Sequence, residues 1–141
     1  MPEPIEEIKY FPKRPLHEEA EDLVRKVLSN LLGIPLYKEN LKIFGKPKEF
    51  DLVNIKTRIV GDVKRLTTKG VASAEEADMC KYIWLMEKLE ASTGWKWRKI
   101  IVGVGWREIF ERFARNYDPW LGSLEIYFMD EKGNIHKIRD K

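Results

Sequence analysis

Two short stretches of the chain, Glu49-Phe50-Asp51-Leu52-Val53 and Ile59-Val60-Gly61-Asp62-Val63-Lys64, carry most of the information about its fold. Both have the apolar, β-branched composition of buried strands, yet they contain two central aspartates and a lysine. An ionised side chain in such surroundings is costly unless it is paired, hydrogen-bonded or bound to a metal. Asp51, Asp62 and Lys64 are therefore the first candidates for a functional site.

The spacing of these residues predicts how they meet. Side chains two positions apart in a strand point to the same face, so Asp62 and Lys64 project together. The polar segment 54–58 suits a hairpin turn, which brings Asp51 close to Asp62. Two carboxylates a few ångströms apart cannot both ionise cheaply, and a divalent cation between them resolves the repulsion. Carboxylate ligands suit magnesium or manganese.

The remaining elements follow from hydrophobic periodicity and turn residues. In chain order we expect an extended arm over 1–15, a helix over 17–32, strands near 36–44, over 50–55 and from 58, a loop over 67–73, a helix over 74–91, a strand over 99–104, a helix over 106–116, and a hairpin of 123–129 with 135–138. Residues 16–141 suffice for one core and are too few for two, so a single α/β domain is expected after the arm.

At Asp51 and Asp62-Val63-Lys64 the sequence resembles the paired motif of the PD-(D/E)XK nuclease superfamily. Phe50 replaces the proline that usually precedes the first aspartate, a departure that does not touch the chemistry. The resemblance covers residues 16–104 and implies a restriction-endonuclease-like core. Such a core is a mixed central β-sheet flanked by helices in the order α-β-β-β-α-β, followed here by a C-terminal helix and hairpin.

The superfamily also carries a glutamate on the helix ahead of the strands. Glu19 and Glu21 lie at the two margins of the apolar face predicted for the helix over 17–32. The run Ala20-Glu21-Asp22-Leu23-Val24-Arg25 resembles the helical motif of archaeal Holliday junction resolvases, which favours Glu21, with Glu19 as the reserve. The alternative is a solvated carboxylate near the positive start of the helix.

The resemblance implies metal-dependent hydrolysis of a phosphodiester in DNA that leaves a 5′-phosphate. Asp51 and Asp62 would hold magnesium or manganese with the backbone carbonyl of Val63, and Glu21 would add a ligand directly or through water. Lys64 would orient the attacking water and stabilise charge rather than act as a base. The small size and the resolvase-like helix favour an endonuclease specific for junction or branched DNA.

Basic residues are concentrated around the motif, because lysine and arginine outnumber acids between residues 41 and 70. Lys46, Lys48, Arg65 and Lys69 are expected to contact phosphates without reading base sequence. The alternative is a solvated basic sheet edge, which discourages pairing with other chains.

Further expectations concern location and partners. The sequence has no apolar run near the length of a membrane span and no secretory signal pattern, so a cytoplasmic protein without membrane contact is expected. The single cysteine, Cys80, excludes an internal disulfide and a cysteine-ligated iron–sulfur cluster, and no nucleotide cofactor is expected. The absence of glutamine and a charged fraction of 35% are typical of a thermophile.

A homodimer is expected, because one region carries more apolar surface than a small core covers, and two active sites would suit a branched substrate. The region contains Trp106, Phe110, Phe113, Trp120 and Leu121.

Two other interpretations remain open. The chain could be a non-catalytic nucleic-acid-binding or assembly module that retains the nuclease fold. Alternatively, the motif is coincidental, and Asp51 and Lys64 form a structural ion pair in an ordinary α/β domain. The choice between DNA and RNA also stays open, because it depends on groove geometry and 2′-hydroxyl contacts.

Overall fold

The computed structural model describes residues 13–66 and 72–140. Its elements are α2 (Lys13–Leu32), β1 (Tyr37–Ile43), β2 (Lys46–Asn54), β3 (Ile59–Arg65), α3 (Ala72–Thr93), β4 (Arg98–Val104), α4 (Arg107–Tyr117), a 3₁₀ turn η2 (Asp118–Trp120), β5 (Glu125–Met129) and β6 (Ile135–Arg139). The predicted order of helices and strands is confirmed.

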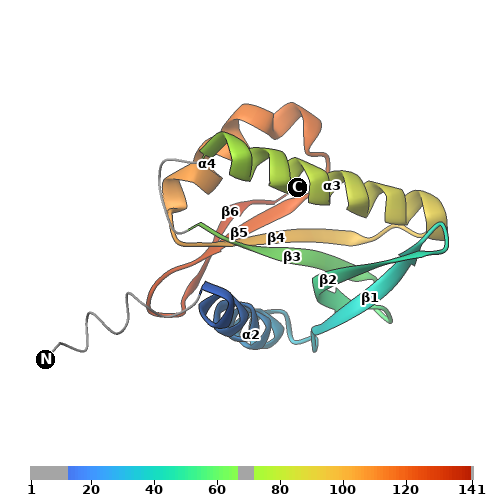
Figure 1. Cartoon of the computed structure of the whole chain (residues 1–141), viewed down its shortest axis with the longest axis horizontal. Helices are drawn as coiled ribbons and strands as arrows, with labels where there is room; N and C mark the ends of the chain where they lie inside the picture. The colour runs from blue at the N-terminus through green and yellow to red at the C-terminus, as the bar shows by residue number, and fades with distance from the viewer. Residues whose placement is uncertain (1–12, 67–71, 141) are drawn as a thin grey trace, which may run out of the picture.

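The strands form one mixed sheet in the order β1-β2-β3-β4-β5-β6. The pairs β1–β2, β2–β3 and β5–β6 are antiparallel, whereas β3–β4 and β4–β5 are parallel. Helices α3 and α4 cover one face and α2 covers the other (Figure 1). The predicted α/β fold with a mixed sheet flanked by helices is therefore confirmed.

Three predicted boundaries were wrong. Helix α2 begins at Lys13, so the last three residues of the predicted arm are helical, and the rest of the arm lies outside the described residues. Helix α3 begins at Ala72, inside the predicted loop over 67–73. Strand β2 begins at Lys46 instead of residue 50, because 46–49 pair with β1 at the sheet edge without a buried apolar pattern.

Each face of the sheet has its own apolar core. The core under α3 and α4 includes Val60, Met79, Phe110 and Phe113, all of them buried. The core under α2 contains Val24, Leu28, Leu52, Ile59, Val63, Ile100, Val102, Tyr127 and Met129. Because Val60 and Val63 belong to opposite cores, strict alternation along β3 places Asp62 and Lys64 on the α3 face.

A β-bulge breaks this alternation in β2. The β1–β2 register pairs Tyr37 with Val53 but Glu39 with Phe50, so β2 has one extra residue between these pairs. Phe50 consequently packs under α3, while Leu52, two positions on, packs under α2. Bulges re-aim side chains and are frequent beside functional sites. This one lies at Asp51.

The hairpin turn between β2 and β3 agrees with the prediction. Asn54 Oδ1 accepts hydrogen bonds from the backbone N–H and the hydroxyl of Thr57, at 2.9 and 2.8 Å. Arg58 closes the turn with a left-handed φ of 59°. The ladder then runs from Asn54–Ile59 to Leu52–Gly61, so Asp51 and Asp62 lie immediately beyond its last pair.

Candidate metal centre

The two aspartates meet where the β2–β3 ladder ends. The backbone N–H of Asp51 donates to Asp62 Oδ1 at 3.3 Å, and the backbone N–H of Val63 donates to Asp51 Oδ2 at 3.0 Å. Each carboxylate therefore bonds a backbone group on the opposite strand, beyond the last ladder pair. The hairpin brings Asp51 and Asp62 together as the sequence predicts.

This pair is buried and electrostatically unfavourable when both groups are ionised. Asp51 is 8% exposed and Asp62 is 6% exposed. Burial raises the pKa of Asp62 well above its ordinary value, and the negative charge of Asp51 raises it further, although Lys64 acts in the opposite direction. A proton or a cation must therefore balance this pair of carboxyl groups at neutral pH.

Glu21 lies on α2 beside this pair and is held by a lysine that sequence reasoning missed. Its side chain is buried, and Lys38 Nζ on β1 donates to Glu21 Oε1 at 3.1 Å. The hydrogen bond to Glu21 is the main cause that raises the pKa of Lys38, with smaller contributions from Glu49 and Asp51. Lys38 thus lies among three carboxylates.

The bulge explains why Lys38 was missed. Lys38 is the β1 residue skipped between the two register pairs, so it lies opposite the extra residue in β2, next to Asp51. An alternating pattern of side chains does not indicate this position. Glu19, the reserve candidate, is exposed on α2, which leaves Glu21 as the helix carboxylate beside the sheet.

Lys64 forms an ion pair with a residue of α3 and not with Asp51. Its ammonium forms an ion pair with Asp78, and its Nζ lies 5.3 Å from the centre of the Tyr82 ring. The structural Asp51–Lys64 ion pair of the alternative interpretation is therefore not formed in this structure, where Lys64 pairs with Asp78. Sequence spacing gave no signal for this contact, which joins β3 to a helix.

Tyr82 forms a wall of the site. Burial raises the pKa of its hydroxyl to about 12, and the charges of Asp62, Asp51, Glu49 and Glu21 contribute in that order. The ring packs edge-on against Phe50, with the ring centroids 6.3 Å apart. One phenol therefore lies within electrostatic range of every acid in the site.

The predicted basic residues are only partly described. Lys46, the first residue of β2, is exposed, whereas Lys48 in β2 and Arg65 at the end of β3 are half-buried. Lys48 Nζ lies 4.9 Å from the centre of the Tyr82 ring, so this lysine borders the site. Lys69 lies outside the described residues.

The donor set suits a hard divalent cation, because both buried groups are carboxylates and one of them is costly to ionise without a counter-charge. Within residues 13–66 and 72–140, no group of three or more histidine, cysteine, aspartate or glutamate side chains is close enough to hold a metal ion together. Asp51 and Asp62 thus form a pair, and Glu21, predicted as a further ligand, lies in the ion pair with Lys38.

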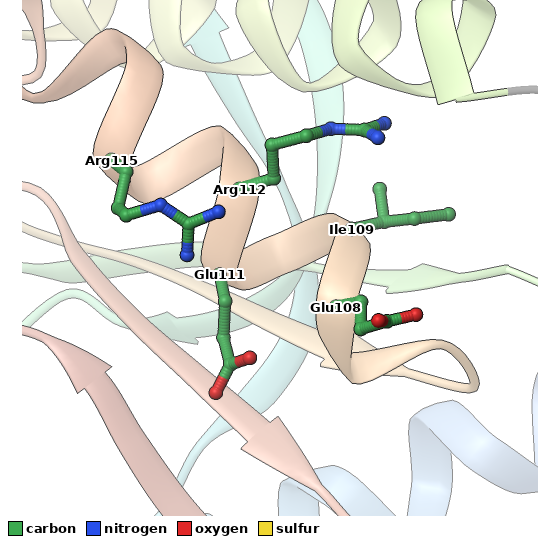
Figure 2. A pocket seen from close by; sticks show the side chains of 5 residues that line it. All are labelled: Glu108, Ile109, Glu111, Arg112 and Arg115. Carbon is green, nitrogen blue, oxygen red and sulfur yellow. The ribbon is translucent and has the colours of Figure 1, made fainter.

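A separate hollow of about 370 Å³ runs along α4 and shares no residue with this pair. Figure 2 shows its lining side chains, with Arg112 directed toward α3. There Arg112 Nε lies 3.7 Å from Glu76 Oε2. The hollow is lined by both acidic and basic side chains, and we assign it no role in the candidate site.

The chain matches no protein-family model, no curated protein and no solved structure at a significant level. No helix within the described parts of the chain is long and apolar enough to cross a membrane.

Proposed function

We propose that the protein is a magnesium- or manganese-dependent deoxyribonuclease with a restriction-endonuclease-like core, which cleaves junction or branched DNA. The observation that carries this proposal is the buried pair of Asp51 and Asp62 at the diverging ends of β2 and β3. Lys64 lies two residues beyond Asp62, on the face covered by α3.

The order of elements supports the proposal. One helix precedes three antiparallel strands, a helix crosses over from β3, and β4 returns parallel to β3. This is the order that the resemblance to PD-(D/E)XK nucleases implies for the core.

In this proposal the aspartate pair, Lys64 and the Glu21–Lys38 ion pair have three different roles. Asp51 and Asp62 would hold the cation, which would supply a nucleophilic water and neutralise charge on the phosphate. Lys64 binds the phosphate or orients the water, for which its ammonium must exchange Asp78 for the substrate. Glu21 and Lys38 fix α2 against the sheet beside the pair and set the local charge.

The basic residues position the DNA. Lys48 and Arg65 flank the site on β2 and β3, and Lys46 extends the positive charge along the β1–β2 hairpin. Contacts of this kind bind phosphates and carry no sequence information.

A second candidate function is a non-catalytic nucleic-acid-binding or assembly module. The specific observation in its favour is that Lys38 and Lys64 already pair with Glu21 and Asp78, which neutralises two of the acids around the site without a metal. In such a module the ion pair between Lys64 and Asp78 would persist when nucleic acid binds.

The experiment that separates the two compares cleavage of labelled four-way junction, flap, single-stranded and duplex DNA, with magnesium, manganese or chelator. Asp62→Asn is the test variant, and Asp140→Asn, at an exposed aspartate, is the matched control. Cleavage that needs the metal and Asp62 but not Asp140 supports the nuclease. Binding without cleavage by the folded protein in either metal supports the module and overturns the nuclease.

A further inference from the structure

A groove of about 390 Å³ lies between the β1–β2 turn and the C-terminal half of α3. In Figure 1 the tip of this hairpin stands beside that end of α3. The lining residues are Ile43, Phe44, Lys46, Pro47, Lys48, Lys81, Trp84, Leu85 and Lys88. The groove therefore combines apolar and aromatic surface with four lysines.

Two large aromatic side chains at this groove are exposed to solvent. Phe44 is 69% exposed and Trp84 is 55% exposed. The chain holds Phe44 in a left-handed conformation with φ 48°, which is unfavourable for a bulky residue, and its backbone N–H donates to Ser92 Oγ on α3 at 2.8 Å. The turn is thus tied to the helix with the Phe44 ring displayed at the groove.

The charge of the groove has a single sign. Among the residues that the structure describes, its lining includes Lys46, Lys48, Lys81 and Lys88 and no aspartate or glutamate. Lys88 Nζ lies 5.5 Å from the centre of the Trp84 ring. Ammonium groups beside exposed aromatic faces are the combination that binds a phosphate backbone while its bases stack.

Lysines of the groove and of the candidate metal centre approach the same aromatic ring, that of Tyr82. Lys48 and Lys81 both line the groove and lie 4.9 and 5.9 Å from the centre of the Tyr82 ring. Lys64, of the candidate metal centre, lies 5.3 Å from the same ring centre. A strand bound in the groove would therefore pass close to Tyr82, which borders the candidate metal centre.

We propose that this groove binds an unpaired segment of a DNA strand, which stacks on Trp84 and Phe44 and leads into the candidate metal centre. The inference rests on the proposed function and names its substrate as DNA with a single-stranded part. Duplex DNA offers phosphates to the lysines, but its bases are already stacked inside the helix and cannot reach the two rings. The volume matches that of a site for one small ligand, such as a nucleotide.

A second copy of the chain is the less favoured occupant of the groove. A two-fold interface brings the same patch of each copy together, so four lysines would face four lysines without an acid among the lining residues. Charge complementarity favours a polyanion.

The test measures binding in chelator, where no metal-dependent cleavage occurs, with labelled oligothymidine of about 12 nucleotides and a duplex of equal length. Trp84→Leu keeps apolar area but removes the aromatic face, and Trp84→Phe restores one. We expect Trp84→Leu to weaken single-strand binding by about fivefold or more and Trp84→Phe to recover most of it, because stacking contributes about 1–3 kcal/mol per base. Trp95→Leu, at a tryptophan that is 39% exposed outside the groove, should change nothing.

The salt dependence of binding gives a second readout. Lys46→Ala and Lys88→Ala should each reduce the slope of log affinity against log salt by about 0.7, the value for one phosphate contact with a single strand. Lys26→Ala, at an exposed lysine of α2, is the matched control and should leave the slope unchanged.

Equal effects of Trp84→Leu on single strand and duplex, or no effect on either, would overturn the inference. A change of oligomeric state in Trp84→Leu with unchanged DNA binding would assign the groove to a second copy. If Trp84→Leu cleaves a junction as well as the unaltered protein does, the proposed role of the groove is wrong, but the proposed nuclease activity is not affected. If the protein binds single strands tightly but cleaves no DNA, the proposed nuclease activity is wrong, but single-strand binding by the groove is supported.

Discussion

The side chains of Asp51 and Asp62 affect the stability of the folded protein in two opposite ways. Their oxygens accept hydrogen bonds from backbone N–H groups of Asp51 and Val63, and they also place two carboxyl groups in a buried position. The hydrogen bonds stabilise the strand ends, whereas the shared charge destabilises the folded state without a cation. Substitution can separate these two contributions.

Asp62→Asn should make the metal-free protein more stable at neutral pH. The amide oxygen still accepts the hydrogen bond from the Asp51 N–H, and a neutral amide, unlike the buried carboxyl group, needs neither a proton nor a counter-charge in the folded protein. In the same variant, magnesium should no longer raise the melting temperature, because ligand binding stabilises only a protein that binds it. Thermal melts with magnesium and with chelator check both parts, and a destabilised Asp62→Asn variant in chelator would contradict the account of the pair.

The raised pKa of Asp62 predicts the sign of a pH dependence in the metal-free protein. A group that holds its proton more tightly when folded contributes stability below its ordinary pKa of 3.8, and this contribution is lost as pH rises toward the raised value. The free energy of unfolding in chelator should therefore fall between about pH 5 and about pH 9. Urea titrations measure it, and Asp62→Asn should flatten the profile.

At the residue level, the sequence predicted that Asp51 and Asp62 meet, but it did not predict the partners of Lys38 and Lys64. A hairpin of known spacing is local, so the meeting of Asp51 and Asp62 follows from the turn at 54–58. The contacts Lys64–Asp78 and Lys38–Glu21 join different elements, and the second depends on a bulge. Neither the packing of a helix on a sheet nor an inserted residue leaves a periodic signal in one sequence.

At the scale of elements, the ion pair of Lys38 with the buried Glu21 is one of the contacts that join α2 to the edge of the sheet. Glu21 is 5% exposed, so removal of its partner leaves a carboxylate with little solvent to replace the ammonium. We expect Lys38→Met to lower the free energy of unfolding by about 1–3 kcal/mol. The side chain of Lys38 is 36% exposed, which keeps this cost below that of a fully buried pair.

The double variant Glu21→Gln/Lys38→Met provides the control for this prediction. The neutral amide needs no counter-charge, so Lys38→Met should cost less in the Glu21→Gln background than alone. Additive costs in urea unfolding would show that the two side chains do not interact.

The elements themselves were predictable because each carries a local pattern. Apolar residues at three- and four-residue spacing mark α2, and β-branched runs mark β3 and β4. The first half of β2 was missed, since Lys46 to Glu49 are polar and belong to a hairpin whose stability comes from β1. Its turn uses positive φ angles at Phe44 and Gly45, and Phe44 gives no turn signal in the sequence.

At the scale of the whole molecule, the apolar surface expected for a dimer is smaller than the sequence suggested. Phe110, Phe113 and Leu121 are buried in the core under α3 and α4, whereas Trp106 and Trp120 are exposed. The homodimer stays a prediction that now depends on these two tryptophans. Sedimentation equilibrium should give twice the mass of the chain, and Trp106→Ser with Trp120→Ser should shift the protein toward the monomer; a monomer before substitution would contradict the prediction.

The reciprocal bonding at the end of the β2–β3 ladder also limits how this protein could diverge. Under the proposed function, a descendant that no longer cleaved DNA would still need acceptors for the N–H groups of Asp51 and Val63. Asparagine supplies an acceptor without charge, whereas valine or leucine would leave a backbone donor buried and unsatisfied. On this proposal, relatives without nuclease activity should carry asparagine at these two positions and should be more stable than active ones in the absence of metal.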